Sequence, residues 1–126
     1  MATVNLDGFG HVEAETVGAT KTLDVGDSGI VQNCPVSTVV TLPASVAGNA
    51  GVLYMIRVGA AGKTIEIAPN SGDKIMGGGL TAADDKSIYF TNQPAGSYVF
   101  LRSNAQATTD SAWVVERLLG TITREA

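Results

Sequence analysis

Hydrophobic and polar positions alternate along most of this chain in short runs that are rich in β-branched residues. In residues 63–68, Ile65 and Ile67 alternate with Thr64 and Glu66, which is the pattern of a strand with one buried face. Most runs end at Gly, Pro, Asn or Asp, the residues that favour turns. The runs predict strands at 21–25, 30–33, 37–42, 52–58, 63–68, 74–76, 86–91, 97–103, 112–118 and 120–123.

Short strands separated by turn residues about every ten positions are typical of a β-sandwich or a small barrel. The predicted fold class is therefore all-β: an antiparallel β-sandwich or a jelly-roll-like small barrel over residues 21–126. Periodicity does not reveal strand order, so both architectures stay open. Residues 52–58 form the strongest predicted strand, and both of its faces are mostly apolar. We therefore expect this strand to be central in its sheet and covered on both sides.

The first 20 residues lack this rhythm. Gly8, Gly10 and Gly18 interrupt them, while Glu13 and Glu15 add negative charge. Neither the strand period nor the helix period emerges here. We therefore expect residues 1–20 to form an irregular N-terminal arm, or an irregular edge segment, ahead of the β-domain, with a disordered tail as the alternative.

The composition favours a protein whose surface is partly covered by contacts. At 126 residues the chain fits one domain, and 44% hydrophobic residues suffice for a core. Only 16% of the residues are charged, against about 25% in a typical domain. Because interface cores are depleted in charge, we expect a homo-oligomer; a lone monomer with a surface rich in Thr, Ser and Gly is the alternative.

Charge and hydropathy argue against two classes of partner. The formal net charge is −4 and the eight Lys and Arg residues are scattered, whereas a nucleic-acid binder needs a basic face. No apolar run is long enough to span a membrane, and the first residues lack the regions of a signal peptide. The single cysteine, Cys34, excludes an intrachain disulfide, so we expect a reducing compartment and a buried structural thiol.

Residues that carry catalysis are scarce in this sequence. His11 is the only histidine, and a histidine metal site needs several ligands, so we expect no metal and no cofactor. Asp84 and Asp85 are neighbours, whereas glycosidases need two carboxylates that face each other across a cleft. Asp24 and Asp27 lie beside glycines, which indicates a turn rather than a calcium loop. We therefore predict that the protein is not an enzyme.

Two further features are of interest for close contacts or binding. Gly77–Gly79 can adopt positive φ, which predicts a tight reversal or a close backbone approach. The segment lacks the Lys-Ser/Thr pair of a phosphate loop. Tyr89 faces away from Ile88 and Phe90 on its predicted strand, which makes it the best candidate for an exposed platform that binds a sugar. Packing in the core or in an interface is still the role that we expect for Tyr89, ahead of such a platform.

The layout of strands and turns points to a known group of proteins. Residues 38–43 read TVVTLP and 54–59 read YMIRVG; later, 65–69 read IEIAP, 73–77 read DKIMG and 113–115 read WVV. This layout resembles that of small β-rich virion proteins of tailed bacteriophages. The resemblance covers roughly residues 21–120. Within that group the chain is most similar to capsid decoration (head cement) proteins.

The resemblance implies a non-enzymatic virion structural protein, made in the cytoplasm of the bacterial host, that binds the outer capsid surface. It would stabilise the shell as a homotrimer by bridging neighbouring subunits of the major capsid protein. The resemblance also implies that the arm reaches the shell, so the expected contact residues are Val4, Leu6, Phe9, His11 and Val12. The alternative is a receptor- or glycan-binding module of a head fibre or tail fibre. A Thr-rich distal face would favour decoration, whereas exposed aromatics with loop acids would favour the alternative.

Overall fold

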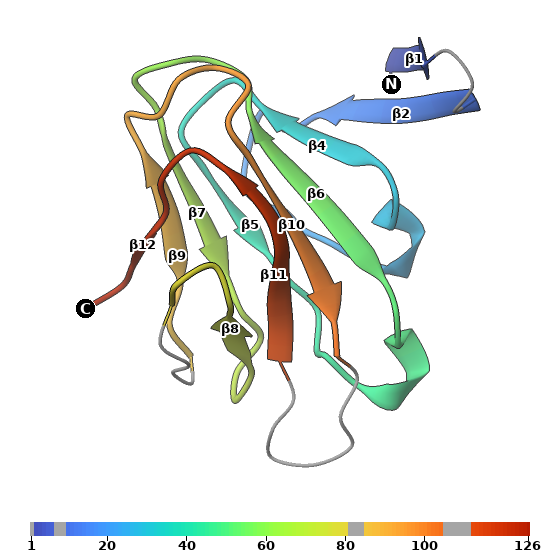
Figure 1. Ribbon diagram of the computed structural model, residues 1–126, viewed down its shortest axis with the longest axis vertical. Coiled ribbons are helices and arrows are strands. Elements are labelled where there is room, and N and C mark those ends of the chain that lie inside the picture. Colours follow the sequence, from blue (N-terminus) through green and yellow to red (C-terminus); the bar gives the residue numbers. More distant parts are fainter. Residues whose placement is uncertain (1, 7–9, 81–84, 105–111) are drawn as a thin grey trace.

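The described part of the chain consists of strands, turns and two short 3-10 helices. The computed structural model describes residues 2–6, 10–80, 85–104 and 112–126. These residues form a seven-stranded and a five-stranded sheet that pack face to face (Figure 1). The β-sandwich predicted from the sequence is confirmed, and each of the ten predicted runs overlaps a strand.

The order of the strands across each sheet differs from their order in the chain. The larger sheet contains, from edge to edge, β1 (Ala2–Leu6), β2 (Gly10–Thr16), β4 (Val31–Cys34), β6 (Leu53–Val58), β10 (Tyr98–Ser103), β11 (Ala112–Leu119) and β8 (Lys74–Met76). The smaller sheet contains β12 (Thr123–Arg124), β9 (Ile88–Thr91), β7 (Thr64–Ala68), β5 (Thr38–Thr41) and β3 (Lys21–Thr22). The helices η1 (Val25–Asp27) and η2 (Ala47–Asn49) lie in connections between strands. Within the described ranges, no helix has the length and apolarity to cross a membrane.

Both sheets are mixed, so the expectation of purely antiparallel pairing is wrong. From β2 to β7 the chain alternates between the two sheets, and sheet neighbours are therefore separated in sequence by a strand of the other sheet. As a result β4 runs parallel to β2 and β6, and β5 runs parallel to β3 and β7. β8 is also parallel to β11. Parallel neighbours need such crossover connections, which side-chain alternation within a strand does not reveal.

The N-terminal segment is more regular than expected. β1 and β2 form an antiparallel hairpin whose register runs from Ala2 opposite Ala14 to Leu6 opposite Gly10. Residues 14–16 of β2 then pair with residues 31–33 of β4 and join the hairpin to the larger sheet. The irregular conformation expected for the arm is therefore wrong for these strands, because backbone pairing organises a segment whose side-chain pattern is weak. The division into arm and domain at residue 20 stays a prediction.

The core lies between the two sheets. Trp113, Tyr54 and Phe90 are its largest fully buried side chains, and the rings of Trp113 and Tyr54 are 5.0 Å apart. Nε1 of Trp113 donates to the backbone oxygen of Pro43 (3.1 Å), and the hydroxyl of Tyr54 donates to the backbone oxygen of Asp24 (2.7 Å). Both large aromatic side chains thus bury their polar ends with a partner, as buried Trp and Tyr usually do.

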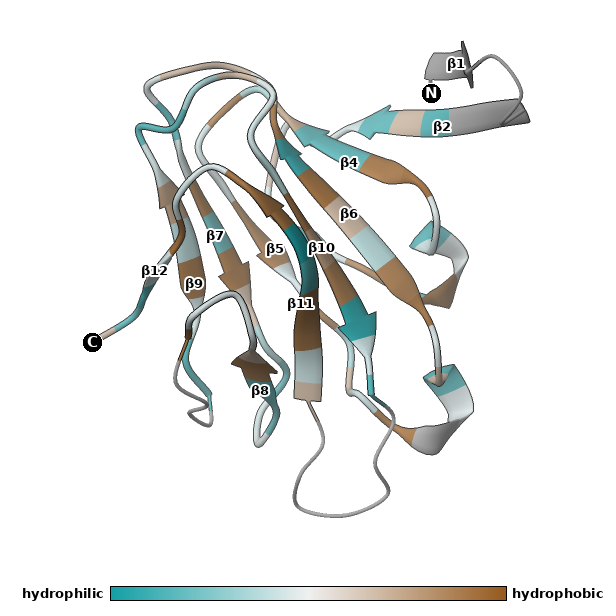
Figure 2. Ribbon diagram, viewed as in Figure 1, coloured by the Kyte–Doolittle hydropathy of each residue, from teal (hydrophilic) through white to brown (hydrophobic). Residues whose placement is uncertain are grey.

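Strand β6 occupies the centre of the larger sheet, as predicted, because it is the fourth of seven strands. Its residues Tyr54 and Ile56 point into the core and have no exposed surface. Met55, on the opposite face, is only half-buried, and Arg57 is exposed. The expectation that both faces are covered is therefore wrong for the described chain. The smaller sheet covers only the inner face of β6. Strands β4, β6 and β10 carry hydrophobic stretches (Figure 2), and among the described elements none covers the outer face of their sheet.

Candidate functional site

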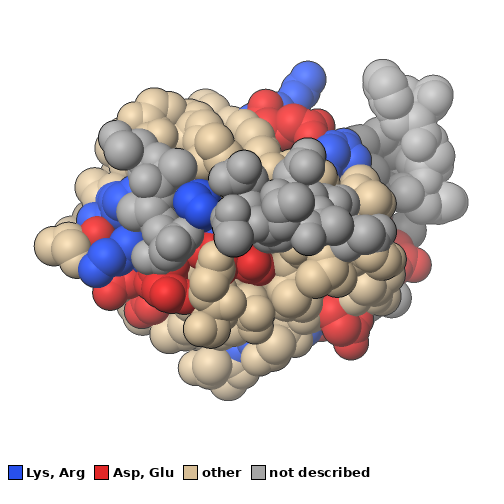
Figure 3. Space-filling model, turned by 90° about the horizontal axis from the view of Figure 1, so that it is seen from below, with Lys and Arg blue, Asp and Glu red and all other residues tan. Residues whose placement is uncertain are grey.

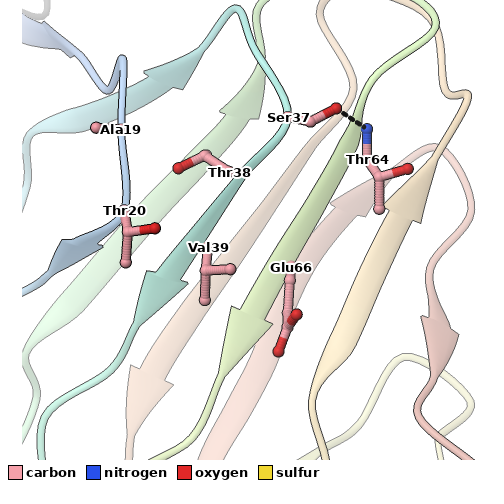
Figure 4. A pocket seen from close by; sticks show the side chains of 7 residues that line it. All are labelled: Ala19, Thr20, Ser37, Thr38, Val39, Thr64 and Glu66. Atoms are coloured by element: carbon pink, nitrogen blue, oxygen red, sulfur yellow. Dashed lines mark hydrogen bonds between the residues drawn. The ribbon is translucent and has the colours of Figure 1, made fainter.

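An open groove lies on the outer face of the smaller sheet, and we call it the hydroxyl groove. Its volume is about 500 Å³, and it is lined by Ala19, Thr20, Ser37, Thr38, Val39, Thr64 and Glu66 (Figure 4). Val39 of β5 and Glu66 of β7 are neighbours in the sheet register. Oγ of Ser37 accepts a hydrogen bond from the backbone nitrogen of Thr64 (3.0 Å) and so fixes one end of the groove.

Two polar side chains of the hydroxyl groove, Thr38 and Glu66, differ in their surroundings. Thr38 is only 8% exposed, and its Oγ1 has no hydrogen-bond partner in the described structure. Figure 4 shows this hydroxyl turned toward the segment that carries Ala19 and Thr20. One carboxylate oxygen of Glu66 accepts a hydrogen bond from Oγ of Ser87 (2.9 Å). A buried hydroxyl without a partner is uncommon. Thr38 lies on the same side of β5 as the core residue Val40, so its hydroxyl is covered and is not in reach of a ligand in the open groove.

Tyr89 lies beside the hydroxyl groove, opposite Glu66 in the register of β9 and β7. Ile88 and Phe90 are buried, so the prediction that Tyr89 faces away from them is confirmed. Desolvation, together with the charges of Glu66 and Glu125, raises the pKa of the Tyr89 hydroxyl. Among the lining residues Glu66 is the one carboxylate, whereas glycoside hydrolysis uses two. The groove is thus suited to hydrogen bonding with a hydroxyl-rich ligand and lacks a carboxylate pair for acid–base chemistry.

The outer face of the larger sheet has a different character. Along β4, β6 and β10, every second side chain points away from the core, and most of these outward side chains are half-buried. Strand β11 adds two exposed side chains to the same face. We call this surface the arginine-rimmed face; its members are Val31, Leu53, Met55, Arg57, Tyr98, Phe100, Arg102, Arg117 and Leu119. A shallow cavity of about 170 Å³ lies at its centre, over Val31, Met55 and Phe100.

Apolar side chains are continuous across this face. Val31, Met55 and Phe100 stand side by side on three neighbouring strands, and the rings of Tyr98 and Phe100 are 4.9 Å apart. Leu119, opposite Tyr98, is 55% exposed. Burying such a surface against a partner would remove apolar area from water, which is the main favourable term in most protein association.

The predicted shell-contact residues lie on the β1–β2 hairpin, except Phe9, which lies outside the described residues. Val4 and Val12 are directly opposite each other in the hairpin register, and Leu6 is opposite Gly10. His11 is opposite Asn5. β1 is the last strand of the larger sheet and pairs only with β2 among the described strands. The hairpin therefore offers one free strand edge, and the assignment of these residues to shell contact stays a prediction.

A polar cluster that the sequence analysis missed anchors the base of the hairpin. Nζ of Lys21 forms an ion pair with Glu15 of β2, contacts Asp27 of η1 at 3.2 Å and donates to Oε1 of Gln32 of β4 (3.0 Å). Burial by itself would lower the pKa of Lys21, but the hydrogen bonds to Glu15 and Asp27 outweigh it, and the pKa is raised. No spacing in the sequence predicts this cluster, because its members meet through a parallel crossover.

A second buried polar cluster holds the loop after β5. Oγ of Ser45 donates to the backbone oxygen of Ala112 (2.9 Å) and lies 2.8 Å from Oγ of Ser103, which contacts Oδ1 of Asn49 at 3.1 Å. A carboxylate oxygen of Asp73 accepts from the backbone nitrogen of Ser45 (2.8 Å). Burial raises the pKa of Asp73 despite this hydrogen bond. Ser45 is fully buried, so its hydroxyl has no access to a substrate and serves to fasten the loop.

The remaining sequence candidates have structural roles. Cys34 is fully buried, as predicted, and burial raises the pKa of its thiol to about 11. Asp24 and Asp27 form the turn predicted for them: Asp24 caps η1 by accepting from the backbone nitrogen of Gly26, and Asp27 accepts from that of Asp24. Gly77–Gly79 all have positive φ and form the predicted tight reversal.

Within the part of the chain that the structure describes, carboxylates outside these turns do not gather into a metal site. Asp85 accepts a hydrogen bond from the backbone nitrogen of Gly72, and its neighbour Asp84 lies outside the described residues. In the described ranges, His, Cys, Asp and Glu side chains form no group of three or more that could hold a metal ion. At the end of the molecule shown in Figure 3, acidic and basic side chains lie beside one another next to a broad uncharged area.

Comparison of the chain with models of protein families, with curated proteins and with solved structures finds no match. The candidate sites therefore rest on their own geometry.

Proposed function

We propose that this protein is a non-enzymatic structural component of a phage particle. In this proposal it binds the outer capsid surface and bridges neighbouring subunits of the major capsid protein. The observation that carries the proposal is the β1–β2 hairpin, which extends the larger sheet away from the rest of the sandwich and ends in a strand with one free edge (Figure 1). Such an edge can add to a strand of another protein through backbone hydrogen bonds.

Bridging in this proposal depends on several weak contacts made at once. In a homotrimer three hairpins would engage the shell together, and each bound hairpin raises the effective concentration of the next. The low fraction of charged residues, 16%, leaves surface for contacts between copies. In this proposal the outer face of the smaller sheet, where Thr20 and Thr64 are exposed, would be the distal face.

Truncation of the hairpin tests the proposal, and the structure sets where to cut. Val17 is only 3% exposed, and its backbone nitrogen donates to the oxygen of Asn33 (2.8 Å). Glu15 is needed for the ion pair with Lys21. Removal of residues 2–12 leaves both interactions intact, so we expect the truncated protein to keep its circular dichroism spectrum and lose co-sedimentation with phage shells that lack this protein. Binding of the folded truncated chain at the full-length level would contradict the role of the hairpin.

The number of copies per particle tests the location. Quantitative mass spectrometry of purified virions should give a copy number comparable with that of the major capsid protein. A handful of copies would instead indicate a tail or vertex fibre, and absence from particles would remove the virion proposal.

The second candidate function is glycan recognition by the hydroxyl groove, as in a receptor-binding module of a head or tail fibre. It is favoured by the open groove on the outer face of the smaller sheet and by Glu66 next to Tyr89. Calorimetric titration with polysaccharide from the host cell surface tests it. Glu66→Gln should abolish binding, and Glu116→Gln, on the opposite sheet, should leave it unchanged. A wild-type protein that binds none of the host polysaccharides would rule this function out.

A further inference from the structure

Most arginines of this acidic chain lie on one sheet face. The sequence contains arginine at positions 57, 102, 117 and 124, and the first three lie on the arginine-rimmed face, whereas the formal net charge is −4. Each of these three is the cross-strand neighbour of an apolar residue of the face. Arg57 is opposite Tyr98, Arg117 is opposite Phe100, and Arg102 is opposite Leu53.

The charge on the face is only partly neutralised. Arg102 forms an ion pair with Glu116, and its Nη1 donates to the backbone oxygen of Gly51 (2.8 Å). Arg57 and Arg117 are exposed, and within the described residues neither forms a hydrogen bond or ion pair, although the hydrogen bond from Arg102 and the charge of Arg117 both lower the pKa of Glu116. Two positive charges therefore border the apolar centre formed by Met55 and Phe100. Aromatic residues, Met and Arg are the residue types enriched in protein interfaces, and Arg and Tyr are typical of their strongest contacts.

We propose that the arginine-rimmed face docks on an acidic protein surface with an apolar centre. This inference rests on the proposed function, because the acidic surface is taken to belong to the capsid shell. Charge decides between this partner and a second copy. Two copies placed face to face would bring Arg57 and Arg117 of one copy near those of the other, and like charges across an interface are unfavourable. An acidic partner would neutralise both arginines.

The face is continuous with the hairpin that carries the proposed function. Ala14 at the end of β2 is the register neighbour of Val31, which stands beside Met55, so one sheet surface runs from the hairpin base to Phe100. A shell subunit that added a strand to β1 could also cover this surface. The hairpin would then supply backbone pairing, and the face would supply apolar burial and charge.

Charge reversal at single exposed positions tests the inference. Arg57→Glu and Arg117→Glu each change the net charge by the same amount as Lys63→Glu, a control at a half-buried position just before β7 on the other sheet. The probe is phage shells that lack this protein, and binding is measured by co-sedimentation over a range of protein concentrations. We expect each arginine variant to raise the dissociation constant about tenfold, since a glutamate at either position would place like charges opposite each other across the interface with an acidic partner. Lys63→Glu should leave it within about twofold.

The outcomes separate this inference from the proposed function. Loss of binding in both arginine variants, with Lys63→Glu unaffected, supports the acidic docking partner. Wild-type binding that the arginine variants retain overturns the inference and leaves the proposed function intact. A wild-type protein that does not bind shells overturns the proposed function and the inference with it. Arginine variants that change the sedimentation coefficient of the free protein show that the face meets a second copy instead, which also overturns the inference.

Discussion

The two outer faces of the sandwich enclose one core, yet they present opposite chemistry. On the smaller sheet, hydroxyl groups and the carboxylate of Glu66 line an open groove, next to Tyr89. On the larger sheet, Met55 and Phe100 form an apolar centre between arginines. The inward residues of both sheets are mostly apolar, because they share the same hydrophobic core. The comparison teaches that the inward half of each strand specifies the fold, while the outward half is free to specify partners.

The edge strands of the two sheets also differ, in their length. The smaller sheet ends in β3 and β12, which have only two residues each, whereas the larger sheet ends on one side in the five-residue β1. Very short edge strands discourage pairing with another chain. A longer edge strand beside an apolar face favours it. Edge and face both favour the larger sheet over the smaller one as a surface for protein association.

A substitution that disrupts the hydrophobic core between the two sheets should have the largest effect on stability. Trp113→Ala removes the largest fully buried side chain, together with its contact with Tyr54 and its hydrogen bond to Pro43. We expect the free energy of unfolding to fall by about 3–5 kcal/mol, measured by urea denaturation. Both faces should lose their binding together. Met55→Ala is the control on the outer face, and it should cost less because Met55 is only half-buried. Equal losses in the two variants would mean that the face of Met55 is covered in solution.

The sequence predicts a structural feature when that feature depends only on residues close together in the chain. The alternation of Ile65 and Ile67 with Thr64 and Glu66 predicts β7 because each residue's environment repeats every second position. The turn at Gly77–Gly79 is predicted for the same reason, since positive φ is a local property of glycine. Parallel pairing and the β1–β2 hairpin are not predictable in this way, because both depend on which distant strand lies alongside.

The candidate sites follow the same rule. Tyr89 is predicted to point outward from its own strand pattern, and it does. The hydroxyl groove joins residues from 19 to 66, and the arginine-rimmed face joins residues from 31 to 119. Neither set has a recognisable spacing in the sequence. The three arginines are scattered along the chain, and only strand order brings them to one face.

Alkaline pH should weaken the sheet that carries the arginine-rimmed face. Burial, with the charges of Asp27 and Asp24, raises the pKa of Tyr54 to about 12 from 10.0, and burial raises that of Cys34 to about 11 from 9.0. Both residues point inward from the larger sheet. For both groups the unfolded chain ionises at lower pH than the folded one, so their stabilising contribution is complete below about pH 9. It should fall as the pH rises from about 9 to about 12.

The pH effect is measured as the thermal unfolding midpoint at closely spaced pH values. Lys21, whose pKa is also raised, contributes in the same direction above pH 10.5. Cys34→Ala should remove the part of the decrease at the lower end of this range, and Tyr54→Phe the part at the upper end. A midpoint that stays constant up to pH 12 would show that neither group is protected from ionisation in the folded protein.

One substitution to threonine on each outer face compares the apolar character of the two faces directly. Phe100→Thr removes the ring that lies 4.9 Å from Tyr98, and we expect a loss of about 1–2 kcal/mol in the free energy of unfolding. It should also reduce the fluorescence of an apolar dye bound to the native protein. Val39→Thr, at the floor of the hydroxyl groove, should cost less than about 1 kcal/mol and leave the dye signal unchanged. Equal dye signals in both variants would contradict the apolar character assigned to the larger sheet.

The smallest effect is expected at the rim of the arginine-rimmed face. Glu116 forms an ion pair with Arg102, and the hydrogen bond with Arg102 lowers the pKa of Glu116. Both side chains are largely exposed, so the pair should contribute little to folding, and Glu116→Gln should leave the thermal midpoint nearly unchanged. The variant frees Arg102 and adds one positive charge to the face. If the partner is acidic, shell binding should therefore become up to about threefold tighter at low salt and return to the wild-type level at high salt. Weaker binding of Glu116→Gln would show instead that Glu116 itself contacts the partner, which would assign a cationic group to the shell surface opposite this rim.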